Sequence, residues 1–204
     1  MGLISNGTTL LDSGSLNASV ATGSMVLIKT LTASSSATLD FVHGTSSVVF
    51  DGTYKEYIFK YIDIHPASVA QLTVNFRDGG SDFDASKTTT TFNPYHTEAD
   101  ASGLTYRTAW DLELSTSDQI IAQELGNSND ASGSGTLHIF DPSNTTFWTN
   151  FMGVTTYYQQ WGGESSFQVY YAGQCATTAA IDGVRFKMSS GNIDSGTIKL
   201  YGVK

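Results

Sequence analysis

The sequence predicts an all-β protein, a jelly-roll-like antiparallel β-sandwich that carries an extended N-terminal arm. Composition is the first observation, because only 14% of the residues are charged, 12% are aromatic, and Ser and Thr are abundant. Ser and Thr disfavour helix interiors, whereas Thr and aromatic residues suit a pleated, half-buried surface. Second, about ten short apolar runs recur at intervals of roughly 8 to 15 residues with turn residues between them, which is typical of sandwiches, jelly rolls and barrels.

The first 25 residues are predicted to form the arm, and residues 26–204 the sandwich domain. The arm is dominated by Ser, Gly, Asn and Thr, and its isolated leucines are too sparse to build a core. Such a segment is either disordered or laid along another subunit. In the second case the assembly contacts are expected at Leu3, Leu10, Leu11 and Leu16.

The first half of the domain contains six runs with strand character. Residues 56–64 are mostly apolar or aromatic on both faces, which predicts a central strand. Residues 71–77 alternate apolar and polar side chains, which predicts a strand that faces the core on one side. The strands expected in this half are 26–31, 37–42, 48–50, 56–64, 71–77 and 87–92.

The second half is less regular at its start. Residues 93–117 are interpreted as an irregular lid or loop in which a short helix is weakened by Gly103 and several threonines. Residues 118–126 fit a marginal helix or a strand, and we prefer a strand that forms a long-looped hairpin with residues 135–140. The remaining strands are expected at 147–158, 167–172, 184–188 and 197–203.

Charge and cysteine content exclude several classes of protein. Ten basic residues stand against 19 acidic ones, for a formal net charge of −9, so nucleic-acid binding is excluded as the main function. No stretch approaches 18 apolar residues and the start lacks the pattern of a signal peptide, so no membrane partner is expected. The single cysteine, Cys175, excludes an intrachain disulfide framework and a multi-thiolate metal site.

The sequence contains no motif that predicts catalysis, so we expect a protein that is not an enzyme and needs no cofactor. The nucleophile pattern G-x-S-x-G is absent, and Cys175 alone is better interpreted as a small buried apolar residue. His43, His65, His96 and His138 do not have the spacing of zinc ligands.

Three carboxylates in one glycine-rich turn, Asp78, Asp82 and Asp84, are the only weak candidates for a metal site, with calcium as the ion. The turn lacks the spacing and the closing bidentate Glu of a calcium loop. A solvated hairpin turn is therefore the preferred interpretation.

A cluster of aromatic residues offers a binding hypothesis. Tyr157, Tyr158, Trp161 and Tyr170 surround a Gly162-Gly163 turn, and sugar rings stack on such side chains. The competing interpretation is that alternate members pack into the core while the others form a subunit contact, because aromatic residues also dominate cores and interfaces.

Several segments carry a resemblance to a known family. These are the run 181–202 (IDGVRFKMSSGNIDSGTIKLYG), YKEYIF at 54–59, IHPA at 64–67 and SGTLHIFDPS at 134–143. Together they resemble virion structural proteins of marine tailed bacteriophages over most of residues 26–204. The resemblance implies a structural role in the virion without catalytic residues, and it does not distinguish head, neck and tail.

Two functional hypotheses follow. The first is a non-enzymatic virion structural protein, a surface-exposed capsid decoration or a tail- or neck-associated subunit, held by its arm and by homo-oligomeric contacts, with a trimer preferred. Its partners are other virion proteins, either major capsid or tail proteins. The alternative is a glycan-binding receptor-recognition module of a tail fibre, with a host-surface glycan as ligand.

Overall fold

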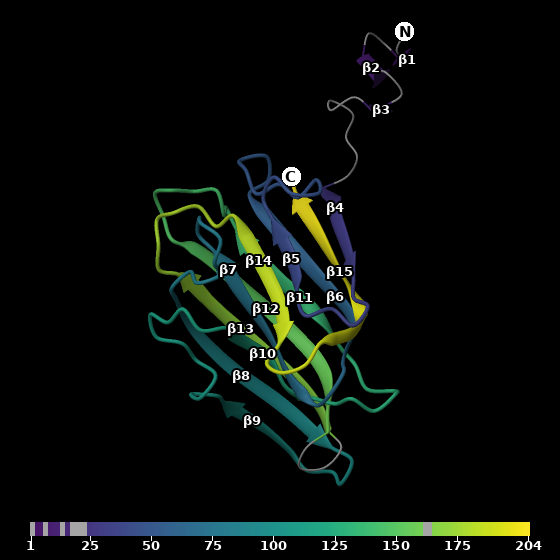
Figure 1. Cartoon of the computed structure of the whole chain (residues 1–204), viewed down its shortest axis with the longest axis vertical. Coiled ribbons are helices and arrows are strands. Elements are labelled where there is room, and N and C mark those ends of the chain that lie inside the picture. Colours follow the sequence, from purple (N-terminus) through teal and green to yellow (C-terminus); the bar gives the residue numbers. More distant parts are fainter. Residues whose placement is uncertain (1–2, 6–7, 13–14, 17–23, 161–164) are drawn as a thin grey trace.

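The computed structural model describes residues 3–5, 8–12, 15–16, 24–160 and 165–204 (Figure 1). Within these residues the chain is all-β, as predicted, and it contains no helix long and apolar enough to cross a bilayer. Strand pairing divides the described residues into a small N-terminal sheet and a sandwich formed by β4 to β15.

The larger layer of the sandwich is an antiparallel sheet of eight strands. Its order is β4-β15-β6-β11-β12-β13-β8-β9. In that order the strands are β4 (Met25–Thr32), β15 (Ile193–Val203), β6 (Glu56–Pro66), β11 (Gly133–Phe140), β12 (Thr149–Gln159), β13 (Ser165–Cys175), β8 (Lys87–Thr97) and β9 (Ser102–Tyr106). We call this layer the large sheet.

The smaller layer has four strands in the order β10-β7-β14-β5. They are β10 (Gln119–Leu125), β7 (Ala70–Arg77), β14 (Gly183–Met188) and β5 (Leu39–Val42). The two layers meet at one corner, where Leu125 of β10 pairs with Gln159 of β12. We call this layer the small sheet.

The topology is that of a jelly roll with two inserted hairpins. Without β8–β9 and β12–β13, the order β4-β15-β6-β11 faces the order β5-β14-β7-β10. This is the strand order of an eight-stranded jelly roll built from two Greek keys. Both inserted hairpins extend the large sheet beyond β11, so they create a broad outer face that an eight-stranded jelly roll lacks.

The core between the sheets is largely aromatic. Phe41 of β5 meets Phe59 of β6 edge to face, with ring centroids 5.1 Å apart, and Phe76 of β7 lies 4.7 Å from Phe151 of β12. Such ring pairs contribute roughly 0.5–1.5 kcal/mol beyond the area they bury. The pairs connect the two sheets and hold β12, an inserted strand, to the same core.

A buried group of hydroxyls anchors the inserted β12–β13 hairpin to the jelly roll. The Tyr61 hydroxyl lies 2.5 Å from Thr155 Oγ1 and 3.2 Å from the Tyr171 hydroxyl, and it donates to the Val154 carbonyl at 3.0 Å. Burial raises the pKa of Tyr61 to about 12, so the phenol stays protonated at physiological pH. The group joins β6, β12 and β13 through polar contacts that exclude water.

Most of the expected strands are confirmed, and three expectations are wrong. Residues 48–50 form no strand; Val48 and Phe50 are buried in a loop whose Phe50 N–H donates to His43 Nδ1. Residues 93–117 are not a lid, because β8 continues to Thr97 and β9 forms a hairpin with it. The strands β10 and β11 do not form a hairpin, since they belong to opposite sheets.

The N-terminal residues contain β1 (Leu3–Ser5), β2 (Thr8–Asp12) and β3 (Ser15–Leu16). Their backbones pair with one another, for example Leu3 with Leu11 and Leu11 with Leu16. The arm expected to be extended therefore has local antiparallel pairing, and its described strands pair with none of the strands β4 to β15. The assembly role of Leu3, Leu10, Leu11 and Leu16 stays a prediction.

Candidate functional site

The outer face of the large sheet carries two neighbouring features, an apolar patch and a polar cavity. Side chains alternate between the core and this face along each strand, as the burial of β12 and β13 shows. The apolar patch lies over β12, β13, β8 and β9, and the cavity lies over the end of the same sheet where β12 and β13 approach their connection. Both features therefore depend on the inserted hairpins, which Figure 1 shows at the lower part of the sandwich.

We define the outer apolar patch by five large, solvent-exposed side chains. They are Phe92, Leu104, Tyr106, Met152 and Tyr170, with exposed fractions of 40, 72, 56, 50 and 37%. Backbone pairing places Tyr170, Phe92 and Tyr106 next to one another on three adjacent strands. An exposed apolar cluster of this kind marks an interaction site more often than a neutral surface.

The polar atoms of the patch are engaged within the sheet. The Tyr170 hydroxyl donates to Gln168 Oε1 at 2.9 Å, and the Thr90 hydroxyl donates to the Tyr106 oxygen at 3.3 Å. A groove of about 360 Å³ runs beside Phe92, Tyr170 and Met152. None of the five patch side chains carries a charge, as is usual at the centre of a protein interface.

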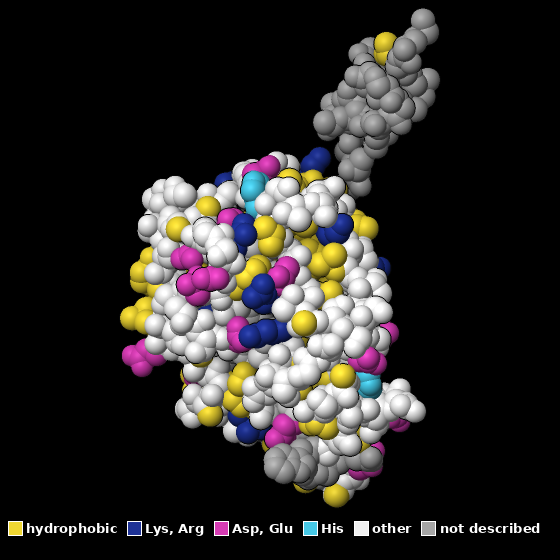
Figure 2. Space-filling model, in the orientation of Figure 1, with side chains coloured by type: hydrophobic (Ala, Val, Ile, Leu, Met, Phe, Trp, Pro, Cys, Tyr) yellow, Lys and Arg dark blue, Asp and Glu magenta, His cyan; other side chains and the backbone are white. Residues whose placement is uncertain are grey.

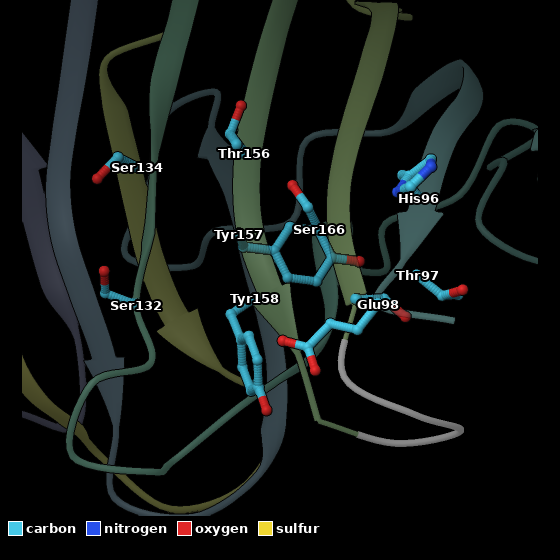
Figure 3. Close-up of a pocket in the computed structure, with 10 residues that line it drawn as sticks. His96, Thr97, Glu98, Ser132, Ser134, Thr156, Tyr157, Tyr158 and Ser166 are labelled. Atoms are coloured by element: carbon cyan, nitrogen blue, oxygen red, sulfur yellow. The ribbon is translucent and has the colours of Figure 1, made fainter. Parts of the chain in front are cut away.

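The polar cavity has a volume of about 580 Å³ and is lined mainly by hydroxyl groups (Figure 3). Its lining comes from β8 and the turn after it, from β11, and from the adjoining ends of β12 and β13. The lining residues are His96, Thr97, Glu98, Ser132, Ser134, Thr156, Tyr157, Tyr158, Ser165 and Ser166.

Charge in the polar cavity is sparse and negative. Within the described part of the chain, Glu98 is the single carboxylate among the lining residues, and none of them is Lys or Arg. Figure 3 shows the Glu98 side chain extending toward Tyr158. His96 is paired with Asp100 at 3.3 Å, on the solvent side of the β8–β9 turn. The cavity therefore offers hydrogen-bonding groups of both kinds around one carboxylate.

Of the four aromatic residues expected to form one platform, the three that the structure describes do not lie together. Tyr157 points into the core with 3% of its surface exposed, its oxygen accepts a hydrogen bond from the Gln123 N–H, and burial raises its pKa. Tyr158 lines the cavity and Tyr170 belongs to the apolar patch. Trp161 lies outside the described residues. Side chains along β12 alternate between the two faces of the sheet, so Tyr158 faces outward and Tyr157 faces the core. Tyr157 therefore cannot stack on a ligand at the surface.

The aspartates of the turn after β7 lie at one end of the small sheet, because β7 is an inner strand. In the part of the chain that the structure describes, no three His, Cys, Asp or Glu side chains are grouped as metal ligands, so Asp78, Asp82 and Asp84 do not form such a group. The turn is instead held by Asp182, which makes a two-pronged ion pair with Arg77 at 2.7 and 2.9 Å and accepts from the Gly79 N–H.

The outer face of the small sheet is occupied by ion pairs. Arg185 makes a two-pronged contact with Asp40 and lies over the ring of Phe83, and Lys187 lies 2.8 Å from Asp118. Figure 2 shows dark blue and magenta side chains next to one another over β14. Because each of these cations faces a carboxylate, this face offers little attraction to an anionic partner such as nucleic acid.

Cys175 is buried, as expected, and a buried lysine lies opposite it. Cys175 of β13 pairs with Lys87 of β8, and both side chains are inaccessible to solvent. Burial raises the pKa of the Cys175 thiol to about 12 and lowers the pKa of Lys87 to about 8. A protonated thiol is a poor nucleophile. Because both side chains are buried, a substrate cannot reach either of them. Lys87 occupies an inward-facing position of β8, and its burial was not predicted from the sequence.

A scan of protein-family models and a search of curated proteins find no match to this chain. The outer face of the large sheet carries two features that can each bind a partner. The apolar patch can be buried against another protein, and the polar cavity can hold a small ligand that forms many hydrogen bonds.

Proposed function

We propose that this chain is a non-enzymatic virion structural protein, a surface-exposed capsid decoration or a tail- or neck-associated subunit. The observation that carries the proposal is the outer apolar patch on the large sheet, over strands that are additions to the jelly roll. Five uncharged side chains with 37 to 72% of their surface exposed favour a role in contacts between proteins. The resemblance of residues 26–204 to phage virion proteins supports the same class of function.

We propose that the apolar patch forms contacts between copies of this chain. Large aromatic and Met side chains are enriched at interface cores, whereas Lys, Glu and Asp are depleted there. Phe92, Tyr106 and Tyr170 provide the kind of aromatic anchors that dominate binding energy in such contacts. Closed symmetry is the usual outcome for identical subunits, and a trimer is our preferred assembly, with other virion proteins as further partners.

We propose that the arm reaches a neighbouring subunit without disturbing the sandwich. It precedes β4, which lies at one end of the strand order of the large sheet, and Ser24 accepts a backbone hydrogen bond from Lys204 at the C-terminus. The arm and the C-terminus therefore leave the domain at the same place. The arm was expected at residues 1–25, but β4 already begins at Met25. We therefore propose that residues 1–24 hold the subunit in the particle while the sandwich faces outward.

Deletion of residues 1–24 tests the proposal in the phage itself. The shortened chain is expected to keep the β signal in circular dichroism and to be lost from purified particles. A full-length chain in which Leu10 and Leu11 are both changed to Ser is the matched variant, and we expect its incorporation to fall as well. Normal incorporation of the shortened chain would show that the arm does not hold the subunit.

The polar cavity favours a second candidate function, a glycan-binding module that reads a host surface. A hydroxyl-lined cavity of about 580 Å³ is within the size range of small-molecule sites. The Tyr158 side chain supplies the aromatic surface that the platform hypothesis required, although Tyr157 does not. Binding of purified chain to a glycan array tests this function, and no binding to any glycan would remove it.

A further inference from the structure

We infer that the polar cavity binds neutral saccharides and discriminates against acidic ones. The inference rests on the second candidate function and adds to it a site and a class of ligand. Three properties of the lining carry it: hydroxyl groups on paired strands, the outward-facing ring of Tyr158 and the carboxylate of Glu98.

The hydroxyl groups match the chemistry of a sugar. Six Ser and Thr residues line the cavity, at positions 97, 132, 134, 156, 165 and 166. A Ser or Thr hydroxyl both donates and accepts hydrogen bonds, as does each hydroxyl of a sugar. Ser134 illustrates the point, because its Oγ accepts from the Asp63 N–H at 3.0 Å, which leaves the Ser134 proton to be donated to a sugar oxygen.

The strands hold several of these groups in fixed positions. Ser134, Thr156, Tyr158 and Ser166 point outward from paired positions on β11, β12 and β13, with Ser134 opposite Thr156 and Tyr158 opposite Ser166. Groups on a sheet lose little conformational freedom when a ligand binds, which lowers the cost of binding. A lining of this kind suits a ligand with hydroxyls at regular spacing.

Tyr158 supplies the apolar surface that a pyranose ring needs. One face of many sugars carries aliphatic C–H groups, and an aromatic ring covers them. Tyr158 is half-buried, and Figure 3 shows it between Ser132 and Ser134 on one side and Glu98 on the other. Ring contact on one side and hydroxyl contacts around it would orient a saccharide of one to a few units in the available volume.

The charge of the lining selects the ligand class. Glu98 is a strong acceptor for sugar hydroxyls, because hydrogen bonds to a carboxylate are stronger than those between neutral groups. The same carboxylate repels a uronic or sialic acid, and none of the lining residues that the structure describes is a Lys or Arg that would offset it. Two like charges about 4 Å apart cost roughly 1 kcal/mol even in bulk water, which is about fivefold in affinity. We therefore expect at least fivefold preference for neutral saccharides.

The cavity is suited to binding rather than hydrolysis. Glycoside hydrolysis of the usual kind needs two carboxyl groups flanking the scissile bond, separated by roughly 5 to 9.5 Å. Among the lining residues that the structure describes, Glu98 is the sole carboxylate. A saccharide held here is thus expected to be released unchanged.

The test uses the purified full-length chain and pairs of matched oligosaccharides. Trimers of galactose, glucose and mannose are compared with the corresponding uronic acid trimers by isothermal titration calorimetry. We expect at least one neutral trimer to bind, its uronic acid counterpart to bind at least fivefold more weakly, and Glu98→Gln to reduce that preference. Equal or stronger binding of every acidic trimer, or no binding of any neutral trimer at millimolar concentration, would overturn the inference.

Variants locate the site. Tyr158→Ala is expected to weaken binding at least tenfold, and Thr156→Trp to block it by filling the cavity from an exposed position that does not touch the core. The matched controls are Phe147→Ala and Glu113→Gln, an exposed aromatic and an exposed carboxylate outside both the cavity and the apolar patch, and both are expected to bind normally. Unchanged binding by Thr156→Trp would place the ligand elsewhere. Because the assay needs no particle, its result is independent of incorporation into the virion.

Discussion

The ring of Phe92 on β8 lies parallel to the ring of Tyr170 on β13, with centroids 5.0 Å apart and 7° between the planes. The two residues are directly paired across the strands, and both remain exposed. Stacking reduces the apolar area that each ring presents to water, but Tyr106, Leu104 and Met152 extend the exposed surface on both sides. In the proposed function, the stack is the centre of the surface that neighbouring subunits bury.

Tyr106→Lys is expected to weaken self-association of the purified chain. Tyr106 has 56% of its surface exposed, so the change does not disturb the core, but it puts a charge into the apolar patch. Truncation or charging of an aromatic anchor typically costs 2 kcal/mol or more, which is roughly a thirtyfold weaker association. Size-exclusion chromatography with light scattering measures the change. Phe147→Lys, at an exposed position outside the patch, should leave the molar mass unaltered.

Gly153→Ala is expected to lower the free energy of unfolding by at least about 1 kcal/mol, because the added methyl group overpacks the core. A Cβ at Gly153 would collide with the Tyr171 hydroxyl and with the Thr136 carbonyl oxygen, a backbone atom of the neighbouring strand. The collision also disturbs the Tyr61, Thr155 and Tyr171 hydroxyl group. Urea denaturation checks the prediction. Gly52→Ala is the control, since its Cβ meets open space, and it should be neutral or slightly stabilising.

Lys87→Met is expected to stabilise the protein at pH 7 and to lose that advantage as the pH rises. Burial lowers the pKa of Lys87 from 10.5 to about 8, so between these values the unfolded chain binds more protons than the folded one. The stability of the unchanged protein therefore rises with pH over this window, by about 3 kcal/mol in full.

Urea denaturation at pH 7 and pH 9.5 measures this effect. The difference in unfolding free energy between Lys87→Met and the unchanged protein should shrink at the higher pH. Tyrosines whose pKa is raised act in both proteins alike, so they cancel in the difference. If the difference does not vary with pH, burial does not lower the pKa of Lys87.

Cys175 is expected to be unreactive in the native protein. Its thiol is fully buried and burial raises its pKa to about 12, so very little thiolate is present at pH 8. Labelling with a disulfide reagent should be slow in buffer and should reach one thiol per chain in 6 M guanidinium chloride. Rapid labelling in buffer would show that β8 and β13 separate readily.

The strand pattern could be predicted from the sequence where periodicity and burial agree. Residues 56–64 have apolar side chains on both faces, and β6 lies between β15 and β11 in the large sheet. The pairing of β10 with β11 was predicted wrongly because proximity in sequence favours a hairpin. In a jelly roll consecutive strands cross between sheets, and no local signal at residues 126–132 distinguishes that crossing from a hairpin turn.

The candidate site was predictable only in part. Alternation along residues 149–159 indicates that Tyr157 and Tyr158 face opposite sides, but not which one faces the core. The polar cavity depends on side chains from four strands separated by up to 70 residues, so neither Ser134 nor Glu98 stood out in the sequence. A lysine is usually expected at the surface, whereas the register of β8 places Lys87 opposite the buried Cys175.

Imaging of the intact phage particle by cryo-electron microscopy, with this chain located in the map, tests the central claim most directly. The account predicts symmetry-related copies in which Tyr106 and Leu104 are buried between subunits and the N-terminal residues contact a neighbouring protein. Particles that lack the chain, or copies whose β8–β9 face stands free in solvent, would contradict it.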